Sequence, residues 1–148
     1  IIFTLVAIFT VEKLGRKPLL IIGSTGMAIG AFAVAIFAES GVGGILPVIA
    51  IIVYSASFMM SWGPVCWVLI SEIFPNTIRG KATAIAVAFQ WISNFLVSYT
   101  FPAFYDFSKA GAYGFYGTIC ILSLLFVWKF VPETKGKTLE EMNTLWRK

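Results

Sequence analysis

Four long apolar segments dominate this sequence and constrain its fold more than any other feature. Together with a shorter apolar run at the start, they cover residues 1–11, 19–38, 45–73, 82–105 and 110–130. A helix needs about 20 apolar residues to cross the hydrocarbon core of a bilayer, so each long segment predicts a membrane span. The run at 1–11 is too short, and we interpret it as a truncated span because a charged exit follows it.

The charge content is typical of a membrane protein. Only 12% of the residues are charged, whereas a water-soluble domain carries about 25%. The net charge of +4 does not indicate nucleic-acid binding, because the basic residues lie between apolar runs and form no continuous stripe. The sequence has no histidine, and Cys66 and Cys120 lie inside apolar runs. We therefore expect the lipid bilayer as a partner, and no enzymatic activity, cofactor or metal site.

The basic residues fall almost entirely on one side of the predicted bundle. If the connections alternate between sides, the loops 12–18 and 72–81 and the tail from Lys129 share one side. They hold ten of the eleven Lys and Arg residues. The loops on the other side, 39–44 and 106–109, hold a single lysine. Since cytoplasmic loops are enriched in Lys and Arg, we expect a multi-pass protein of the inner or plasma membrane with a cytoplasmic C-terminus.

The chain divides into a partial C-terminal transmembrane bundle at residues 1–131 and a cytoplasmic tail at 132–148. The tail contains a capping-box pattern at 138–141, Thr-Leu-Glu-Glu, which is typical of the start of a helix. The apolar side chains that then share one face at helical spacing are Leu139, Met142 and Trp146. This pattern predicts a short amphipathic helix under the bundle, with a frayed tail as the alternative.

Polar side chains occur inside the span at 82–105, where lipid offers them no hydrogen bonds. Those that fall within an arc of about 80° at helical spacing are Thr83, Gln90, Asn94 and Ser98. The amides of Gln90 and Asn94 offer both donors and acceptors, as the binding of a neutral polyol requires. The alternative is that these side chains hydrogen-bond to neighbouring helices and hold the bundle together.

The span at 45–73 carries a second polar set and a predicted break. The polar set is Tyr54, Ser57 and Ser61. At Gly63-Pro64, the proline removes a backbone hydrogen bond and clashes with the carbonyl four residues back. Because the freed carbonyls must meet protein or water, we expect a polar pathway close to this break.

Two tryptophans, Trp62 and Trp67, flank the break. An indole face can pack on the C–H patches of a sugar, and the indole N–H can reach a hydroxyl. The alternative for Trp67 is packing in the core.

A separate small-residue face in the span at 19–38 predicts close helix packing. It is formed by Gly23, Gly26 and Gly30.

Several motifs resemble signatures of the sugar porter family of the major facilitator superfamily. They are Gly15-Arg16-Lys17-Pro18, Gly63-Pro64-Val65-Cys66-Trp67 with Ser71-Glu72-Ile73-Phe74-Pro75 and Arg79-Gly80, and Pro132-Glu133-Thr134-Lys135-Gly136. The resemblance implies an all-α membrane protein, the C-terminal part of the twelve-helix major facilitator fold, from the end of helix eight through helix twelve. The missing N-terminal half of the same transporter is then a partner of this chain.

Within the family, the resemblance is closest to bacterial D-xylose–proton symporters. The pair Gln90-Trp91 is similar to theirs, whereas many glucose and galactose carriers have Asn-Trp, and Cys66 stands where animal glucose facilitators usually carry a proline. By resemblance, Trp67, Gln90 and Trp91 contact the sugar and Gly63 lies at the cavity wall. The polar stripe adds Asn94 as a candidate contact.

The resemblance also implies a cytoplasmic charge network that latches the two six-helix halves when the carrier opens outward. Its members in this chain are Glu12, Arg16, Glu72, Arg79 and Glu133. We expect Glu72 with Arg79 to act in this latch, and fixed surface ion pairs of small energetic value are the alternative.

The implied function is secondary active transport of a monosaccharide, D-xylose with proton symport, by alternating access. In the family the coupling acid lies in the N-terminal half, so the proton as coupling ion rests on the resemblance alone. A hexose carrier and a non-transporting sugar sensor are the alternatives, although the tail of about 19 residues is short for a sensor. An ion channel would need charge rings or a filter loop, and neither pattern occurs in the sequence.

Overall fold

The computed structural model describes residues 9–136, which are almost entirely helical. After a helical segment at 9–14, its helices are α2 (Arg16–Glu39), α3 (Ile45–Met60), α4 (Trp62–Ile73), α5 (Arg79–Phe107) and α6 (Lys109–Phe130). In the described part of the chain, four helical segments are long and apolar enough to cross a membrane, with α3 and α4 together forming one of them. Most of the expected truncated span at 1–11 and the expected tail helix lie outside the described residues.

Three of the helices begin at charged residues that the sequence pattern assigned to loops. Helix α2 starts at Arg16, α5 at Arg79 and α6 at Lys109. Long cationic side chains can place their stems along a helix while their charged heads reach the aqueous boundary. Hydropathy alone therefore places these helix ends up to three residues too far inside the span.

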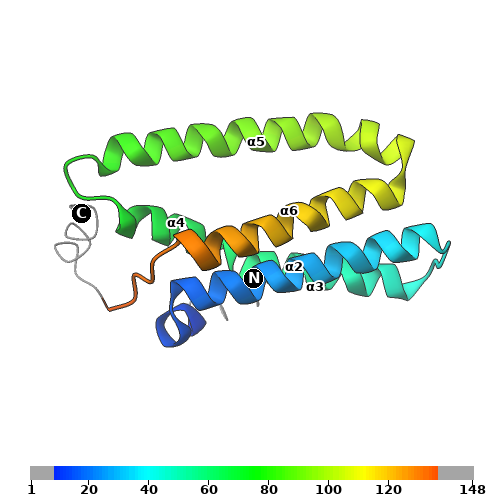
Figure 1. Ribbon diagram of the computed structural model, residues 1–148, viewed down its shortest axis with the longest axis horizontal. Helices are drawn as coiled ribbons and strands as arrows, with labels where there is room; N and C mark the ends of the chain where they lie inside the picture. The colour runs from blue at the N-terminus through cyan, green and yellow to red at the C-terminus, as the bar shows by residue number, and fades with distance from the viewer. Residues whose placement is uncertain (1–8, 137–148) are drawn as a thin grey trace.

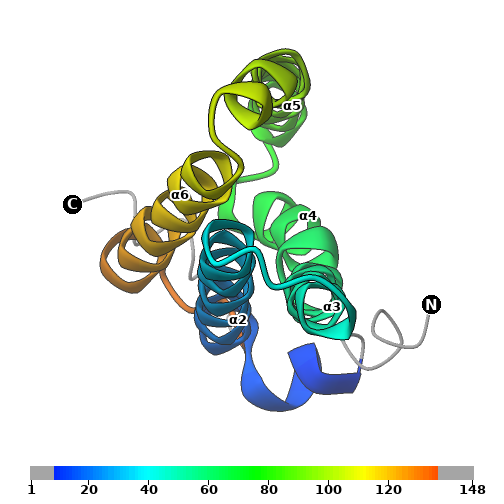
Figure 2. The same ribbon diagram turned by 90° about the vertical axis from the view of Figure 1, so that its right-hand side faces the viewer.

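Helix α2 is the centre of the described bundle and packs against both α3 and α6 (Figure 2). Its glycines lie against α3 so closely that a side chain would not fit. A Cβ atom at Gly23 would lie 1.6 Å from Ser61 Oγ, and one at Gly30 would lie 2.9 Å from the backbone nitrogen of Tyr54. The predicted small-residue face is thus confirmed as a site of close helix packing.

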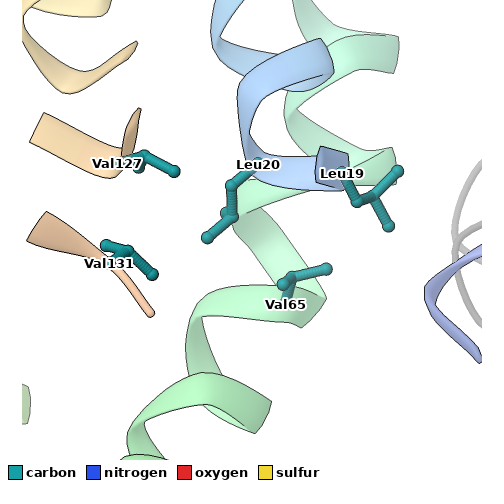
Figure 3. Close-up of a cluster of buried hydrophobic side chains, with 5 residues drawn as sticks. All are labelled: Leu19, Leu20, Val65, Val127 and Val131. Carbon is teal, nitrogen blue, oxygen red and sulfur yellow. The ribbon is translucent and has the colours of Figure 1, made fainter. Parts of the chain in front are cut away.

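The largest buried cluster joins α2, α4 and α6. Leu19 and Leu20 of α2 meet Val65 of α4, and Val127 and Val131 lie at the end of α6 (Figure 3). A smaller buried cluster, formed by Met27, Ala28 and Cys120, joins α2 to α6 farther along the bundle. The two clusters show that α2 contributes to the core along most of its length.

The break in the span Ile45–Ile73 lies at Ser61, which separates α3 from α4. Its backbone has φ −124° and ψ −82°, outside the helical region. Pro64 lies three residues later and would clash with the carbonyl of Met60 in a continuous helix. The break therefore precedes the Gly63-Pro64 pair, because the steric conflict of a proline falls on the preceding turn.

Helix α5 is set apart from α2 in both views of the molecule (Figures 1 and 2). It contacts α6 and α4, and none of its residues is buried. An aromatic cluster joins it to α6, in which the ring of Phe101 lies 5.9 Å from that of Tyr113 and 5.7 Å from that of Tyr116. Most of the surface of α5 is consequently open within the described chain.

Candidate functional site

The predicted sugar-contact residues lie on open surfaces of α4 and α5. Trp67 on α4 is 44% exposed and Trp91 on α5 is 66% exposed. Gln90 and Asn94 are also exposed, whereas Gly63 is half-buried near the start of α4. Among the described residues, no hydrogen bond or ring contact joins Trp67 to the candidates on α5. The structure therefore leaves these side chains accessible without assembling them into a closed site.

The amides of Gln90 and Asn94 have no hydrogen-bond partner within residues 9–136. By contrast, the nearby hydroxyl of Thr100 donates to the carbonyl of Leu96, at 2.7 Å. A primary amide inside a membrane span cannot leave its donors and acceptors facing lipid. The partners of both amides must therefore be water, a ligand or another part of the protein.

The two serines of the second polar set form hydrogen bonds within their own span, and the polar pathway expected near the break stays a prediction. The hydroxyl of Ser57 donates to the carbonyl of Val53, and that of Ser61 donates to the carbonyl of Ser57, each at 2.7 Å. Both serines lie against the glycines of α2. Both hydroxyls therefore donate to backbone carbonyls of the same span.

The two tryptophans beside the break have different environments. The indole nitrogen of Trp62 donates a hydrogen bond of 2.7 Å to the hydroxyl of Ser24, which is fully buried on α2. Trp67 lies five residues later and is exposed. Trp62 is therefore a packing residue between helices, and Trp67 alone of this pair is available to a ligand.

A pocket of about 250 Å³ lies between α2, α3, α5 and α6. It is lined by Ala31, Val34, Ile51, Tyr54, Val97, Phe101, Tyr113 and Tyr116. None of the predicted contact residues borders it. Apart from the tyrosines its lining is apolar, so most hydroxyls of an enclosed sugar would lose their hydrogen bonds to water without replacement. This pocket is not the predicted sugar site.

The charged motifs meet at the end of the bundle where α2 begins and α4 and α6 end. The guanidinium of Arg16 donates two hydrogen bonds to the Glu72 carboxylate, from Nη2 at 2.6 Å and from Nε at 3.1 Å. Thr134 donates its hydroxyl to the same carboxylate at 2.6 Å. Such a two-point Arg–carboxylate contact has a defined geometry as well as charge attraction. The Glu72 carboxylate thus links the start of α2, the end of α4 and the segment after α6.

Glu133 acts as a cap for α2. Its carboxylate accepts hydrogen bonds from the backbone nitrogens of Arg16 and Lys17, each at 3.0 Å. These are among the free amides at the start of a helix, where negative charge is also favoured by the helix dipole. Gly15 has a φ of 96° and a Cβ there would lie 2.7 Å from the carboxylate. The positive φ favours glycine at this position, and a larger residue would also push the Glu133 carboxylate away from the cap.

The expected role of Glu72 and Arg79 in a latch stays a prediction, and these two residues do not pair with each other in this structure. Glu72 pairs with Arg16, and Arg79 instead donates to the carbonyl of Phe74 at 3.4 Å. Glu12 is exposed and makes no ion pair with the other described residues. The structure thus brings together three of the five network residues predicted from the sequence, namely Arg16, Glu72 and Glu133.

Two polar contacts were not identified from the sequence. Thr134 lies inside the motif at 132–136, but nothing in the local pattern indicates that its hydroxyl reaches Glu72. Ser24 lies beside Gly23 on the small-residue face, and its role as an acceptor for Trp62 depends on the crossing of α2 with the helix break. In both cases, the sequence feature that could have indicated the contact is a small hydroxyl residue within or beside a recognised motif.

Comparison with known proteins gives consistent matches over the whole chain. The family described as "Sugar (and other) transporter" matches residues 1–146. The D-xylose-proton symporter of Escherichia coli (strain K12) is 55% identical over 97% of this chain and 31% of its own length. The glucose facilitated diffusion protein of Zymomonas mobilis is 44% identical over 99% of this chain and 32% of its own length.

A solved structure of XylE, the xylose transporter of E. coli, also matches. This structure is of the major facilitator superfamily proton:xylose symporter bound to 6-bromo-6-deoxy-D-glucose. It superposes with a TM-score of 0.91 at 55% identity, over 97% of this chain and 32% of that chain. This chain therefore spans about a third of the length of the proteins it matches.

Proposed function

We propose that this chain, which belongs to the sugar transporter family, forms the C-terminal third of a membrane carrier. The carrier moves a monosaccharide by alternating access. The observation that carries this proposal is the exposure of Trp67, Gln90 and Trp91 on helices of membrane-spanning length. Aromatic faces and an amide without a partner would be poorly suited to lipid, but they suit the wall of a wet sugar cavity.

D-Xylose is the proposed substrate, with a proton as the coupling ion. The support is the 55% identity to a protein named as a D-xylose-proton symporter. A hexose is the second candidate, because a glucose facilitated diffusion protein is 44% identical over nearly the same residues. The proposed carrier lies in the inner or plasma membrane, with the basic loops and the C-terminus in the cytoplasm.

The charge cluster is proposed to act in the conformational cycle. Arg16, Glu72 and Glu133 hold the ends of α2, α4 and α6 together at the proposed cytoplasmic mouth. Charged pairs at such a site can separate and reform as the two halves of a carrier rock against each other. Among the described residues, the charged pair of Arg16 and Glu72 lies within this chain, and its opening or its contacts with the rest of the carrier would then change between the two states.

A chimera tests the proposed function directly. Residues 1–148 would replace the matching C-terminal third of the E. coli D-xylose-proton symporter, and uptake of labelled D-xylose, D-glucose and L-arabinose would be measured in cells lacking xylose transporters. We expect D-xylose uptake. Preferential D-glucose uptake would support the hexose candidate, and sugar binding without uptake would support a sensor. A chimera that reaches the membrane but neither binds nor moves these sugars would contradict the proposal.

Proton coupling needs a separate measurement, because the chimera takes its N-terminal half from another protein. In the complete carrier, this chain together with its own N-terminal helices, addition of D-xylose to a weakly buffered cell suspension should make the medium more alkaline. Uptake without alkalinisation, and without inhibition by a protonophore, would identify a facilitative carrier instead.

A further inference from the structure

The indole of Trp62 occupies the junction between the two buried clusters. It packs against the cluster that contains Leu19, Leu20 and Val65, and it also packs against the second cluster. Its N–H is directed to the fully buried hydroxyl of Ser24, at 2.7 Å. No other described side chain connects both clusters and also makes a hydrogen bond to another helix.

The same residue begins α4 immediately after the break. Ser61, which is fully buried, lies so close to α2 that a Cβ at Gly23 would overlap its hydroxyl. The backbone nitrogen of Val65 donates to the Ser61 carbonyl at 2.9 Å and starts the new helix. Gly23 and Ser24, which are adjacent on α2, thus contact Ser61 and Trp62, which are adjacent at the break.

We propose that Trp62 and Ser24 form a pivot that holds the break in the span Ile45–Ile73 against α2, and that Ser24, acting through Trp62, is a positioning residue for Trp67. The second half of this inference rests on the proposed sugar-binding function. Trp67 follows Trp62 by five residues, so it projects from α4 about 140° around the helix axis. The hydrogen bond between Trp62 and Ser24, on the side of α4 that faces α2, therefore determines the position of Trp67 on the opposite side.

A hydrogen bond is needed here because apolar packing alone leaves the rotation of α4 less defined. Val65 and Leu69 also contact the buried cluster on α2, but apolar contacts are not directional. The indole N–H fixes one orientation, since a buried donor without an acceptor is strongly unfavourable. If Val65 and Leu69 were sufficient, removal of the Ser24 hydroxyl would leave the position of Trp67 unchanged.

A double-mutant cycle tests the positioning role in the complete carrier. Ser24→Ala removes the acceptor, and Trp62→Phe removes the donor while keeping an aromatic ring between the clusters. We expect each variant to weaken D-xylose binding about fivefold, and the double variant to be no weaker than either single one. Thr25→Ala is the matched control, because that exposed hydroxyl bonds only to the Ile21 carbonyl of its own helix.

A second measurement does not depend on sugar. Spin labels at the exposed positions Ile45 and Ser71, on either side of the break, report the angle between α3 and α4 in a background with Cys66 and Cys120 replaced by alanine. We expect Ser24→Ala and Trp62→Phe to broaden the distance distribution, and Thr25→Ala to leave it unchanged.

The outcomes separate this inference from the proposed function. Unchanged distances in both pivot variants would overturn the pivot, whatever the carrier binds. Altered distances with xylose affinity within twofold of wild type, or losses that add in the double variant, would overturn the positioning role. Failure of the unmutated carrier to bind any sugar would overturn the proposed function, and the distances would still decide whether the pivot exists.

Discussion

At the scale of single residues, Gln90 is the most informative side chain. It is exposed on α5, and its amide has no hydrogen-bond partner in the described part of the chain. By count from Ala82 it lies some 12 Å inside the span, close to the middle of a hydrocarbon core of about 30 Å. At this depth a sugar with several hydroxyls is a suitable partner.

We expect Gln90→Ala to lower sugar affinity by about five- to 150-fold, which corresponds to the loss of about 1–3 kcal/mol. The melting temperature of the complete carrier should change little, because water in the empty cavity solvates the amide. If Gln90 instead holds helices together, the melting temperature falls and affinity is unchanged. Measurement of both quantities, with Gln90→Asn as the conservative variant, distinguishes the two roles.

The charge cluster leads to a second residue-scale prediction, which contrasts Glu72 with Arg79. Glu72→Gln removes the carboxylate charge that holds Arg16, so transport should fall severalfold while sugar affinity stays within about twofold. Arg79→Ala removes only two long hydrogen bonds to the Phe74 carbonyl and should have the smaller effect. Uptake in vesicles and binding in detergent measure the two quantities. An equal loss of transport in both variants would contradict the pairing seen here.

At the scale of elements, the approach of α2 to α3 leads to a stability prediction. A Cβ at Gly30 would lie 2.9 Å from the backbone nitrogen of Tyr54 and 3.0 Å from the backbone oxygen of Ala50. Backbone atoms cannot move aside as a flexible side chain does, so Gly30→Ala should push the helices apart and cost about 1–3 kcal/mol.

Gly114 on α6 supplies the matched control for this prediction. Within residues 9–136, a Cβ at Gly114 would have no neighbouring atom within 4 Å, so Gly114→Ala should leave stability unchanged or raise it slightly through helix propensity. A comparison of the melting temperatures of the two purified variants of the complete carrier tests whether α2 and α3 approach as closely as described. A Gly30→Ala variant as stable as Gly114→Ala would show that α2 and α3 are farther apart than described.

At the scale of the whole molecule, the predicted fold class is confirmed. The chain superposes with a TM-score of 0.91 on a major facilitator superfamily structure at 55% identity. Helix α5 has no buried residue, and the amides of Gln90 and Asn94 on its polar stripe are exposed in the described part of the chain. An open polar and apolar surface of this extent supports the proposal that the chain is part of a larger bundle.

We therefore expect residues 1–148 expressed alone to give no sugar uptake. Coexpression of this chain with a separate N-terminal part, made from the first two-thirds of the E. coli D-xylose-proton symporter, should restore uptake if the helix surfaces are complementary. Immunodetection in membranes controls for expression. Uptake of D-xylose by the chain alone would contradict the proposal that it is one third of a carrier.

The sequence by itself determined the four long apolar spans and the small-residue face of α2, whereas most of the candidate site residues came from the family resemblance and stay a prediction. The spans are a local feature, because lipid cannot hydrogen-bond to a backbone and long apolar segments therefore have few alternatives. The tertiary structure decided which partners meet. Arg79 lies seven positions from Glu72 in the sequence, yet the carboxylate binds Arg16, which is 56 positions away. Trp62 and Trp67 both flank the Gly63-Pro64 pair, but the position of α2 covers much of the first indole and leaves the second open. Such pairings depend on how helices cross, and helix crossing is set by side-chain packing summed over the whole bundle.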